Sequence, residues 1–144
     1  MSDADDHQPP PETILYVDDE VLTRLDMSEF LRQCHYRVSE AATAAEALDA
    51  LNAKLVIDLV ITDVKMPGEM DGLALARWIK ENRPGVEVIV QSGDDAVARE
   101  LPDDLKEFGP PLAKPFTGRE LLDRVKLALA RRRPPGQAGD AGAA

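Results

Sequence analysis

The sequence is short of cysteine, of positive charge and of long apolar runs, and each shortage excludes a class of protein. Its single cysteine, Cys34, cannot form a disulfide within the chain, which fits a reducing compartment. The net charge of −10 argues against a nucleic-acid-binding surface. No apolar run is long enough to cross a bilayer, and the acidic start of the chain lacks a signal-peptide pattern. We therefore expect a cytoplasmic protein with no nucleic-acid or membrane partner.

The length of 144 residues suits one domain with a hydrophobic core. Residues 1–11 are acidic and then proline-rich, so we expect a disordered lead-in. Residues 134–144 predict a second disordered tail, which leaves a domain at 12–133. Within that domain Cys34 falls among apolar helix positions, and we expect it in the core.

Apolar, β-branched segments alternate along the chain with segments of helical periodicity. Strands are expected at 13–17, at 36–40, in the run from Leu55 that ends on Asp63, at 86–91 and at 112–113. Helices are expected at 21–34, at 43–52, from Asp71 to Pro84, at 96–101 and from Thr117 to Arg133. Strict alternation with right-handed crossovers predicts an α/β fold, a three-layer α/β/α domain around a five-stranded parallel sheet. A proline cannot stay in a helix interior, so Pro102 makes the fourth helix short.

Three features set the ends and faces of the expected helices. Leu22, Leu25 and other apolar residues of 21–34 recur at roughly helical spacing, which predicts one buried face. Thr43-Ala44-Ala45-Glu46 and Thr117-Gly118-Arg119-Glu120 are capping boxes, in which each side chain satisfies the other residue's backbone N–H. The three arginines at 131–133 complement the dipole at a helix C-terminus, which explains them without a nucleic-acid role.

Five polar residues stand at or just after the expected strand ends. These residues are Asp18, Asp19, Asp63, Ser92 and Lys114. All strands of a parallel sheet end on one edge, where open α/β sheets place their ligands. Taken alone, Asp63 is equally well explained as a turn residue, and Ser92 and Lys114 are better explained as a strand-end turn residue and a solvated surface charge. Their convergence from four strands is what indicates a functional site.

This set of side chains suits phosphoryl transfer. Crowded carboxylates repel one another, and a divalent cation removes the cost of ionising them all. A few hard oxygen ligands, with room for waters and a phosphoryl oxygen, suit Mg²⁺. Asp63 beside the metal can act as a nucleophile on phosphorus, while Lys114 and Ser92 contact the phosphoryl oxygens.

The same residues resemble the receiver domain of two-component response regulators, over roughly residues 12–133. The resemblance rests on the acid pair Asp18-Asp19, on Asp63 with the following Val-Lys-Met-Pro-Gly-Glu-Met-Asp-Gly, on Ser92, and on Lys114-Pro115-Phe116. It implies a flavodoxin-like sheet with strand order 2-1-3-4-5, and a Lys114-Pro115 peptide bond that is cis.

The resemblance also implies the roles of these residues. Asp63 accepts a phosphoryl group from the phosphohistidine of a histidine kinase, or exchanges it with a histidine phosphotransferase. Asp18, Asp19, Asp63 and the backbone carbonyl of Lys65 hold Mg²⁺. Ser92 and Lys114 contact the phosphoryl group. The chain would catalyse only its own phosphorylation and dephosphorylation, so it is not expected to be an enzyme in the wider sense.

Three departures from the family pattern concern the surroundings of the site. The loop between Pro67 and Gly72 has one residue more than the commonest spacing. Pro111 stands where receivers generally carry an aromatic or histidine that turns inward on signalling. Pro102 and the run at 109–111 stiffen the approach to the fifth strand, where the family builds its main output surface.

The leading hypothesis is a stand-alone receiver that signals by binding another protein, whose identity the sequence does not give. A phosphate shuttle or sink is a variant that the missing aromatic favours, and a phosphorylation-independent interaction module is a further alternative. A phosphatase of the haloacid-dehalogenase kind is disfavoured because Asp18-Asp19-Glu20-Val21 lacks the spacing of its nucleophile and acid. Nucleotide or flavin binding is disfavoured because no glycine-rich loop follows Val17.

Overall fold

Five parallel strands form one sheet in the order β2-β1-β3-β4-β5, which confirms the predicted topology. The structure is a computed structural model that describes residues 11–93 and 100–132. The strands are β1 Thr13–Val17, β2 Arg37–Ala41, β3 Leu59–Asp63, β4 Glu87–Ser92 and β5 Leu112–Ala113. The predicted tails, apart from residue 11, and most of the helix expected at 96–101 lie outside the described residues.

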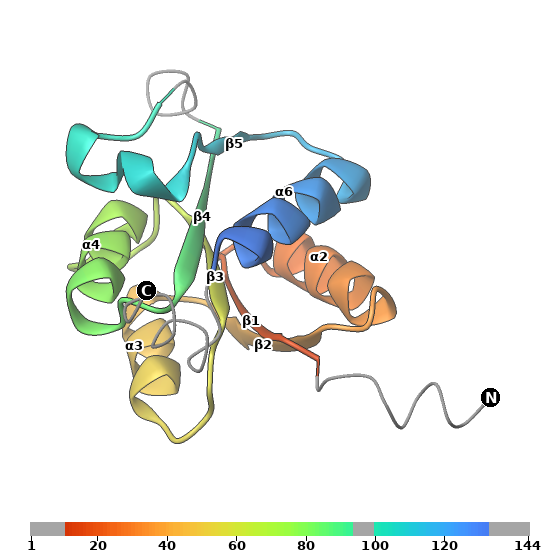
Figure 1. Cartoon of the computed structure of the whole chain (residues 1–144), viewed down its shortest axis with the longest axis horizontal. Helices are drawn as coiled ribbons and strands as arrows, with labels where there is room; N and C mark the ends of the chain where they lie inside the picture. Colours follow the sequence, from red (N-terminus) through yellow and green to blue (C-terminus); the bar gives the residue numbers. More distant parts are fainter. Residues whose placement is uncertain (1–10, 94–99, 133–144) are drawn as a thin grey trace, which may run out of the picture.

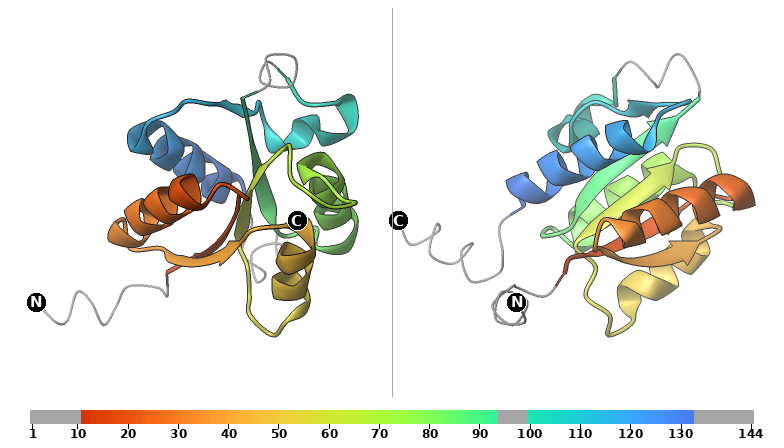
Figure 2. Two further views of the ribbon diagram at one scale, coloured as in Figure 1. Left: turned by 180° about the vertical axis from the view of Figure 1, so that it is seen from behind. Right: turned by 90° about the vertical axis from the view of Figure 1, so that its right-hand side faces the viewer.

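Helices cover both faces of the sheet, giving the expected three layers (Figures 1 and 2). The helices are α2 Val21–Gln33, α3 Ala44–Asn52, α4 Gly72–Asn82, the 3₁₀ helix η1 Asp103–Phe108 and α6 Gly118–Arg131. Figure 1 shows α2 and α6 on one face, and α3, α4 and η1 on the other. Among the described residues no helix combines the length and apolar character needed to span a membrane.

The strand side chains alternate between two hydrophobic cores because successive residues of a strand point to opposite faces. In β1, Ile14 and Tyr16 pack with residues of α2 and α6. Leu15 and Val17 of the same strand pack with residues of α3, α4 and η1. All residues of β1 are buried, as expected for a strand covered by helices on both faces.

Two predictions were wrong: the start of the third strand and the buried face of the first helix. Strand β3 begins at Leu59, so the apolar residues Leu55 and Val56 precede it and are exposed. In α2 only Ser28 and Leu31 are buried, and the side chain of Leu22 is 75% exposed. The helical repeat shows that these residues share one side of the helix, but none of the described elements covers the apolar side chains of its first turns.

Two smaller predictions also differ from the structure. Cys34 is the C-cap of α2 and is only partly buried, so it is not a core residue. The Thr43 side chain does cap α3 by accepting from the Glu46 N–H at 3.1 Å. Glu46, however, accepts from the N–H of Ala42 rather than of Thr43, so this capping box is incomplete. The box at Thr117 and Glu120 has both bonds and is confirmed.

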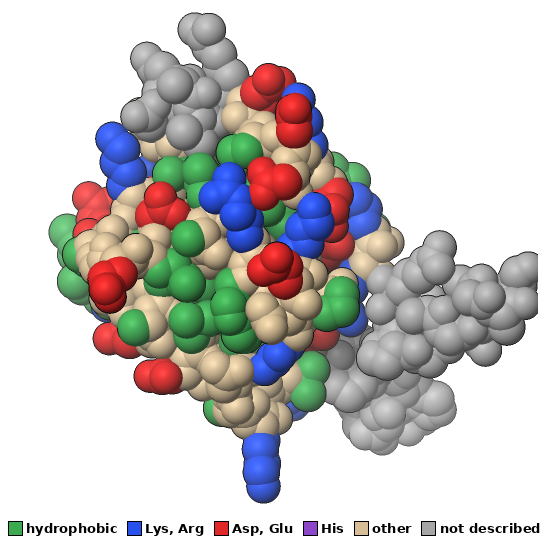
Figure 3. Space-filling model, turned by 90° about the vertical axis from the view of Figure 1, so that its left-hand side faces the viewer, with side chains coloured by type: hydrophobic (Ala, Val, Ile, Leu, Met, Phe, Trp, Pro, Cys, Tyr) green, Lys and Arg blue, Asp and Glu red, His purple; other side chains and the backbone are tan. Residues whose placement is uncertain are grey.

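Between β4 and β5 the described chain forms only the single 3₁₀ helix η1, in agreement with a short and irregular fourth helix. Ion pairs attach η1 to α4: Arg77 to Asp104 at 2.7 Å and Lys80 to Glu107 at 3.2 Å. Figure 3 shows this face, with basic and acidic side chains close together beside an apolar patch. These exposed pairs orient η1 but contribute little stability each.

The start of α4 makes the closest backbone approach to β3. The N–H of Gly72 donates to the Val64 carbonyl at 2.8 Å. A Cβ at Gly72 would lie 1.9 Å from the backbone oxygen of Asp63, so the helix can start here only without a side chain. Gly72 therefore fixes the backbone of the strand end that carries Asp63.

Replacing Gly72 with alanine should destabilise the fold, although alanine favours helices by about 1 kcal/mol. The added methyl group would press on the Asp63 backbone, and overpacking of this kind costs about 1–3 kcal/mol. Urea unfolding followed by circular dichroism measures the effect. Gly85→Ala is the matched control, because a Cβ there meets nothing within 4 Å. A Gly72→Ala variant as stable as the Gly85→Ala variant would contradict this interpretation.

Candidate functional site

Three aspartates meet where the neighbouring strands β1 and β3 end. Asp63 is the last residue of β3, and Asp18 and Asp19 directly follow β1. A carboxylate oxygen of each lies within 4.8 Å of one from the others. Asp18 is fully buried, Asp63 is half-buried and Asp19 is exposed. The structure thus brings together the three side chains that the sequence assigned to one site.

Lys114, which follows the outer strand β5, contacts two of these carboxylates. Its Nζ lies 3.0 Å from Asp63 Oδ2 and 3.4 Å from Asp18 Oδ2. Lys114 directly follows the short strand β5, and its backbone N–H donates to the Ser92 carbonyl at 2.9 Å. The peptide bond between Lys114 and Pro115 is cis, as the resemblance implied.

The remaining predicted residues lie next to this cluster. Ser92 is the last residue of β4 and is buried, and its neighbour Gln91 is paired in register with Asp63. Lys65 lies two residues beyond Asp63 in the loop toward α4, and its side chain is exposed. This position is compatible with a role for its backbone carbonyl rather than for its ammonium group.

Two functional candidates were missed by the sequence reasoning. The Gln91 Nε2 amide donates to Asp18 Oδ2 at 2.8 Å, and the Tyr16 hydroxyl donates to Gln91 Oε1 at 2.8 Å. All three side chains are fully buried. A glutamine at the fourth strand end, amid apolar residues, was the available signal, because buried polar groups need partners.

The carboxylates and the lysine shift one another's pKa. Burial raises the pKa of Asp63, the Lys114 ammonium opposes that rise, and the charges of Asp18 and Asp19 add to it. Burial alone would lower the pKa of Lys114, but its hydrogen bond to Asp63 and the charges of Asp18 and Asp63 raise it overall. The lysine therefore stays charged, while the raised pKa of Asp63 means that ionising this carboxyl group costs more in the folded protein than in the unfolded chain.

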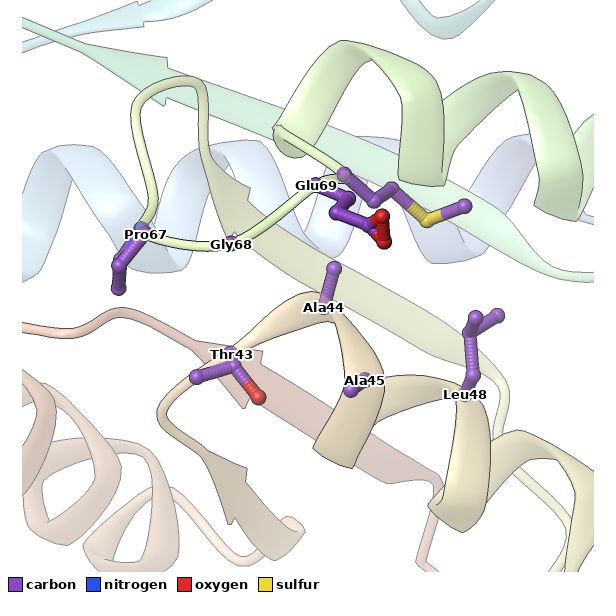
Figure 4. Close-up of a pocket in the computed structure, with 8 residues that line it drawn as sticks. Thr43, Ala44, Ala45, Leu48, Pro67, Gly68 and Glu69 are labelled. Carbon is purple, nitrogen blue, oxygen red and sulfur yellow. The ribbon is translucent and has the colours of Figure 1, made fainter.

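A cavity of about 430 Å³ lies beside the site, between the start of α3 and the loop after β3. Figure 4 shows Ala44 and Leu48 of α3 facing the loop that carries Glu69. Gly68 in this loop has φ +104°, which favours glycine. The lining is mostly apolar and shares no residue with the aspartate cluster, so the cavity is separate from the acidic site.

The donor set fits a hard divalent cation. Three carboxylates within 4.8 Å of one another offer the oxygen ligands that Mg²⁺ prefers, and they carry more negative charge than Lys114 neutralises. The exposed Asp19 leaves one side open to water and to a phosphorylated group. The residues present therefore fit Mg²⁺.

A doubly wound parallel sheet with acids and a lysine at its carboxyl edge defines an α/β domain of the class in which ligands generally bind at that edge. The family model of the response regulator receiver domain matches residues 14–126. The chain belongs to this family.

Individual relatives agree with the family assignment. The chain is 40% identical over 122 residues to the sensor kinase CckA of Brucella abortus, covering 83% of this chain and 13% of the kinase. It is similar to the response regulator receiver protein of Sinorhizobium medicae, with a TM-score of 0.73, 29% identity and coverage of 85% and 98%. It is also similar to TrrA of Thermotoga maritima in complex with Mg²⁺ and BeF, with a TM-score of 0.71, 29% identity and coverage of 81% and 98%. The chain spans at most 58% of the curated relatives compared.

Asp63→Asn should stabilise the metal-free protein at neutral pH. The folded-state pKa of Asp63 is raised above its unfolded value of about 3.9, so ionising Asp63 costs stability. That cost is absent below the unfolded pKa, grows as the pH rises from the unfolded toward the folded pKa, and is constant above the folded pKa. Urea unfolding from pH 4 to pH 8 should show the variant gaining on the wild type as the pH rises. A gain that shrinks with rising pH would contradict the assignment, and Mg²⁺ should reduce the gain by stabilising the wild type.

Proposed function

We propose that the chain is a response regulator receiver that accepts a phosphoryl group on Asp63. The observation that carries the proposal is Lys114 Nζ at 3.0 Å from Asp63 Oδ2, within a cluster of three carboxylates. This arrangement places a fixed positive charge beside Asp63, the carboxylate of this cluster that is half-buried and is the last residue of a strand. Phosphoryl transfer requires mainly such positioning and neutralisation of charge.

In the proposed reaction, a carboxylate oxygen of Asp63 attacks the phosphorus of a phosphohistidine. The P–O bond to Asp63 forms while the P–N bond breaks, and the electron pair stays on the imidazole nitrogen, which takes up a proton. The Lys114 ammonium group, which pairs with the Asp63 carboxylate before the reaction, then pairs with the phosphoryl oxygens. The Ser92 hydroxyl donates a hydrogen bond to one of these oxygens. Attack by water on phosphorus later releases phosphate and restores the Asp63 carboxylate.

Asp18, Asp19, Asp63 and the Lys65 carbonyl are the residues that would hold Mg²⁺. When bound, the ion neutralises charge on the phosphoryl oxygens and on the crowded carboxylates. The Mg²⁺–BeF complex of TrrA is a property of that protein, and it supports the same ion for this chain by similarity. The fit of the three aspartates is the support from this chain itself.

The proposed phosphodonor is a histidine kinase or a histidine phosphotransferase, because receivers of two-component systems take their phosphoryl group from phosphohistidine. Membership of the family and the similarity to part of the sensor kinase CckA support this class of partner. We place the receiver unit at residues 12–133 and the protein in the cytoplasm. In this proposal the chain signals as a single receiver, through contact with another protein.

A phosphate shuttle or sink is a second candidate, favoured by the region that precedes β5. Pro111 is buried and has no side chain that can turn inward. Arg131 donates to the Phe108 carbonyl at 3.0 Å, and Arg124 donates to the Pro110 carbonyl, so α6 holds this segment in place. A segment held in this way suits a protein that passes its phosphoryl group on with little change of shape.

Incubation with a phosphorylated histidine kinase and Mg²⁺ should label the wild type and leave Asp63→Asn unlabelled. Labelling is measured with ³²P on denaturing gels, and acid-stable and base-labile label identifies an acyl phosphate. Asp71→Asn is the matched control, because its carboxylate caps α4 by accepting from the Ala74 N–H and is outside the cluster. Lys114→Ala should lower the labelling rate by at least about tenfold, as expected when charge stabilisation of a phosphoryl group is lost.

Equal labelling of wild type and Asp63→Asn would refute the assignment. Return of the label to a histidine phosphotransferase would favour the shuttle. Steady release of p-nitrophenol from p-nitrophenyl phosphate would instead indicate a phosphatase. A wild type that takes no label from any phosphohistidine donor or from acetyl phosphate would leave the phosphorylation-independent interaction module as the explanation.

A further inference from the structure

A buried chain of hydrogen bonds runs from the acidic site into the core beneath it. The Tyr16 hydroxyl donates to Gln91 Oε1 at 2.8 Å, and Gln91 Nε2 donates to Asp18 Oδ2 at 2.8 Å. Lys114 Nζ reaches the same oxygen of Asp18 at 3.4 Å and Asp63 Oδ2 at 3.0 Å. The side chains of Tyr16, Gln91 and Asp18 are each 0% exposed.

The register of the sheet explains how residues so far apart in sequence meet. Asp63 of β3 pairs with Gln91 of β4, and Tyr16 of β1 pairs with Ile61 of β3. Alternation along the strands puts Tyr16, Asp18, Asp63 and Gln91 on one face. Since β3 lies between β1 and β4, the Gln91 side chain must cross the strand that carries Asp63 to reach Asp18.

The chemistry of the groups fixes the direction of each bond. A carboxylate only accepts hydrogen bonds, so the NH₂ of Gln91 faces Asp18 and its carbonyl oxygen faces Tyr16. The Tyr16 hydroxyl is the donor that satisfies that oxygen. Burial raises the pKa of Tyr16, and the Asp18 charge adds to the rise, so the hydroxyl keeps its proton. Tyr16 thereby holds the Gln91 amide in the orientation in which its NH₂ group donates to Asp18.

We propose that Gln91, oriented by Tyr16, is a positioning residue that fixes the Asp18 carboxylate for Mg²⁺ binding. Gln91 and Lys114 both contact Asp18 Oδ2, while Oδ1 accepts the Glu20 N–H at 2.9 Å. The carboxylate is thus held at both ends, and Oδ1 keeps a lone pair for a cation. The inference deepens the proposed function and rests on it.

The hydrogen bond from Gln91 to Asp18 also affects the position of Lys114. A fully buried carboxylate with no other partner would draw the ammonium group to itself, because an uncompensated buried charge is costly. The Gln91 amide partly compensates Asp18, so Lys114 can sit closer to Asp63 than to Asp18, at 3.0 Å against 3.4 Å. Gln91 therefore leaves the lysine available for the phosphoryl group.

The test measures Mg²⁺ binding directly by isothermal titration calorimetry in wild type, Gln91→Met, Tyr16→Phe and the double variant. Gln91→Met keeps the length of the side chain and removes the amide, so the Kd for Mg²⁺ should rise about tenfold, as for other groups that orient metal ligands. Tyr16→Phe removes one hydroxyl and should raise the Kd about threefold, the effect of one net hydrogen bond. The double variant should match Gln91→Met alone, because Tyr16 acts only through the amide.

A purely structural role is separated from positioning by two controls. Ile89→Val lies on the same strand and face and should lower the thermal midpoint while leaving the Kd for Mg²⁺ within about twofold of wild type. Labelling from acetyl phosphate should require more Mg²⁺ for half-maximal rate in Gln91→Met, while the rate at saturating Mg²⁺ changes less. The double variant leaves no unpaired polar atom of Tyr16 or Gln91, which keeps the test open if Gln91→Met alone fails to fold.

Unchanged Mg²⁺ affinity in folded Tyr16→Phe and in the double variant would overturn the inference. Independent, additive effects of the two substitutions would overturn the orienting role of Tyr16. In both of these outcomes, a wild type that binds Mg²⁺ and is labelled on Asp63 would still support the proposed function. Wild type that binds no Mg²⁺ would overturn the inference together with the metal part of the proposed function.

Discussion

The interaction on which the site depends is the contact of one ammonium group with two carboxylates from different strands. Lys114 lies 3.0 Å from Asp63 and 3.4 Å from Asp18, and no two of these residues are near one another in sequence. Three carboxylates on one sheet edge would otherwise repel one another, and their charge exceeds what one lysine neutralises. The surplus negative charge makes the edge receptive to a cation, and the lysine makes it receptive to a phosphoryl group.

The general architecture could be predicted because parallel strands obey simple rules. Apolar runs between helical segments predicted the five strands. Because strands connected in this way are parallel, all of their carboxyl ends lie at one edge of the sheet. Asp18, Asp63 and Lys114 each follow such a run, so their meeting required no knowledge of packing. The order of the strands came from the resemblance to receivers rather than from the pattern, which is the same for several orders.

The parts that could not be predicted depend on contacts between distant residues. Gln91 bonds to Tyr16 and Asp18, 75 and 73 positions away, and neither pairing leaves a periodic trace in the sequence. Helical spacing likewise shows that Leu22 and Leu25 share a side of α2, but not that the neighbouring elements leave both exposed. Periodicity describes one element, whereas exposure depends on what lies next to it.

The last helix joins the two ends of the sheet. Its chain enters just after Lys114 at the carboxyl edge, and its far end is anchored where the central strands start. There Arg131 pairs with Glu87, the first residue of β4, and Arg132 pairs with Asp58, which directly precedes β3, both at 3.2 Å. A helix of this length spans about 20 Å. Because a helix is stiff over this length, a shift of its start beside Lys114 would also move its end and so stretch the Arg131–Glu87 and Arg132–Asp58 ion pairs.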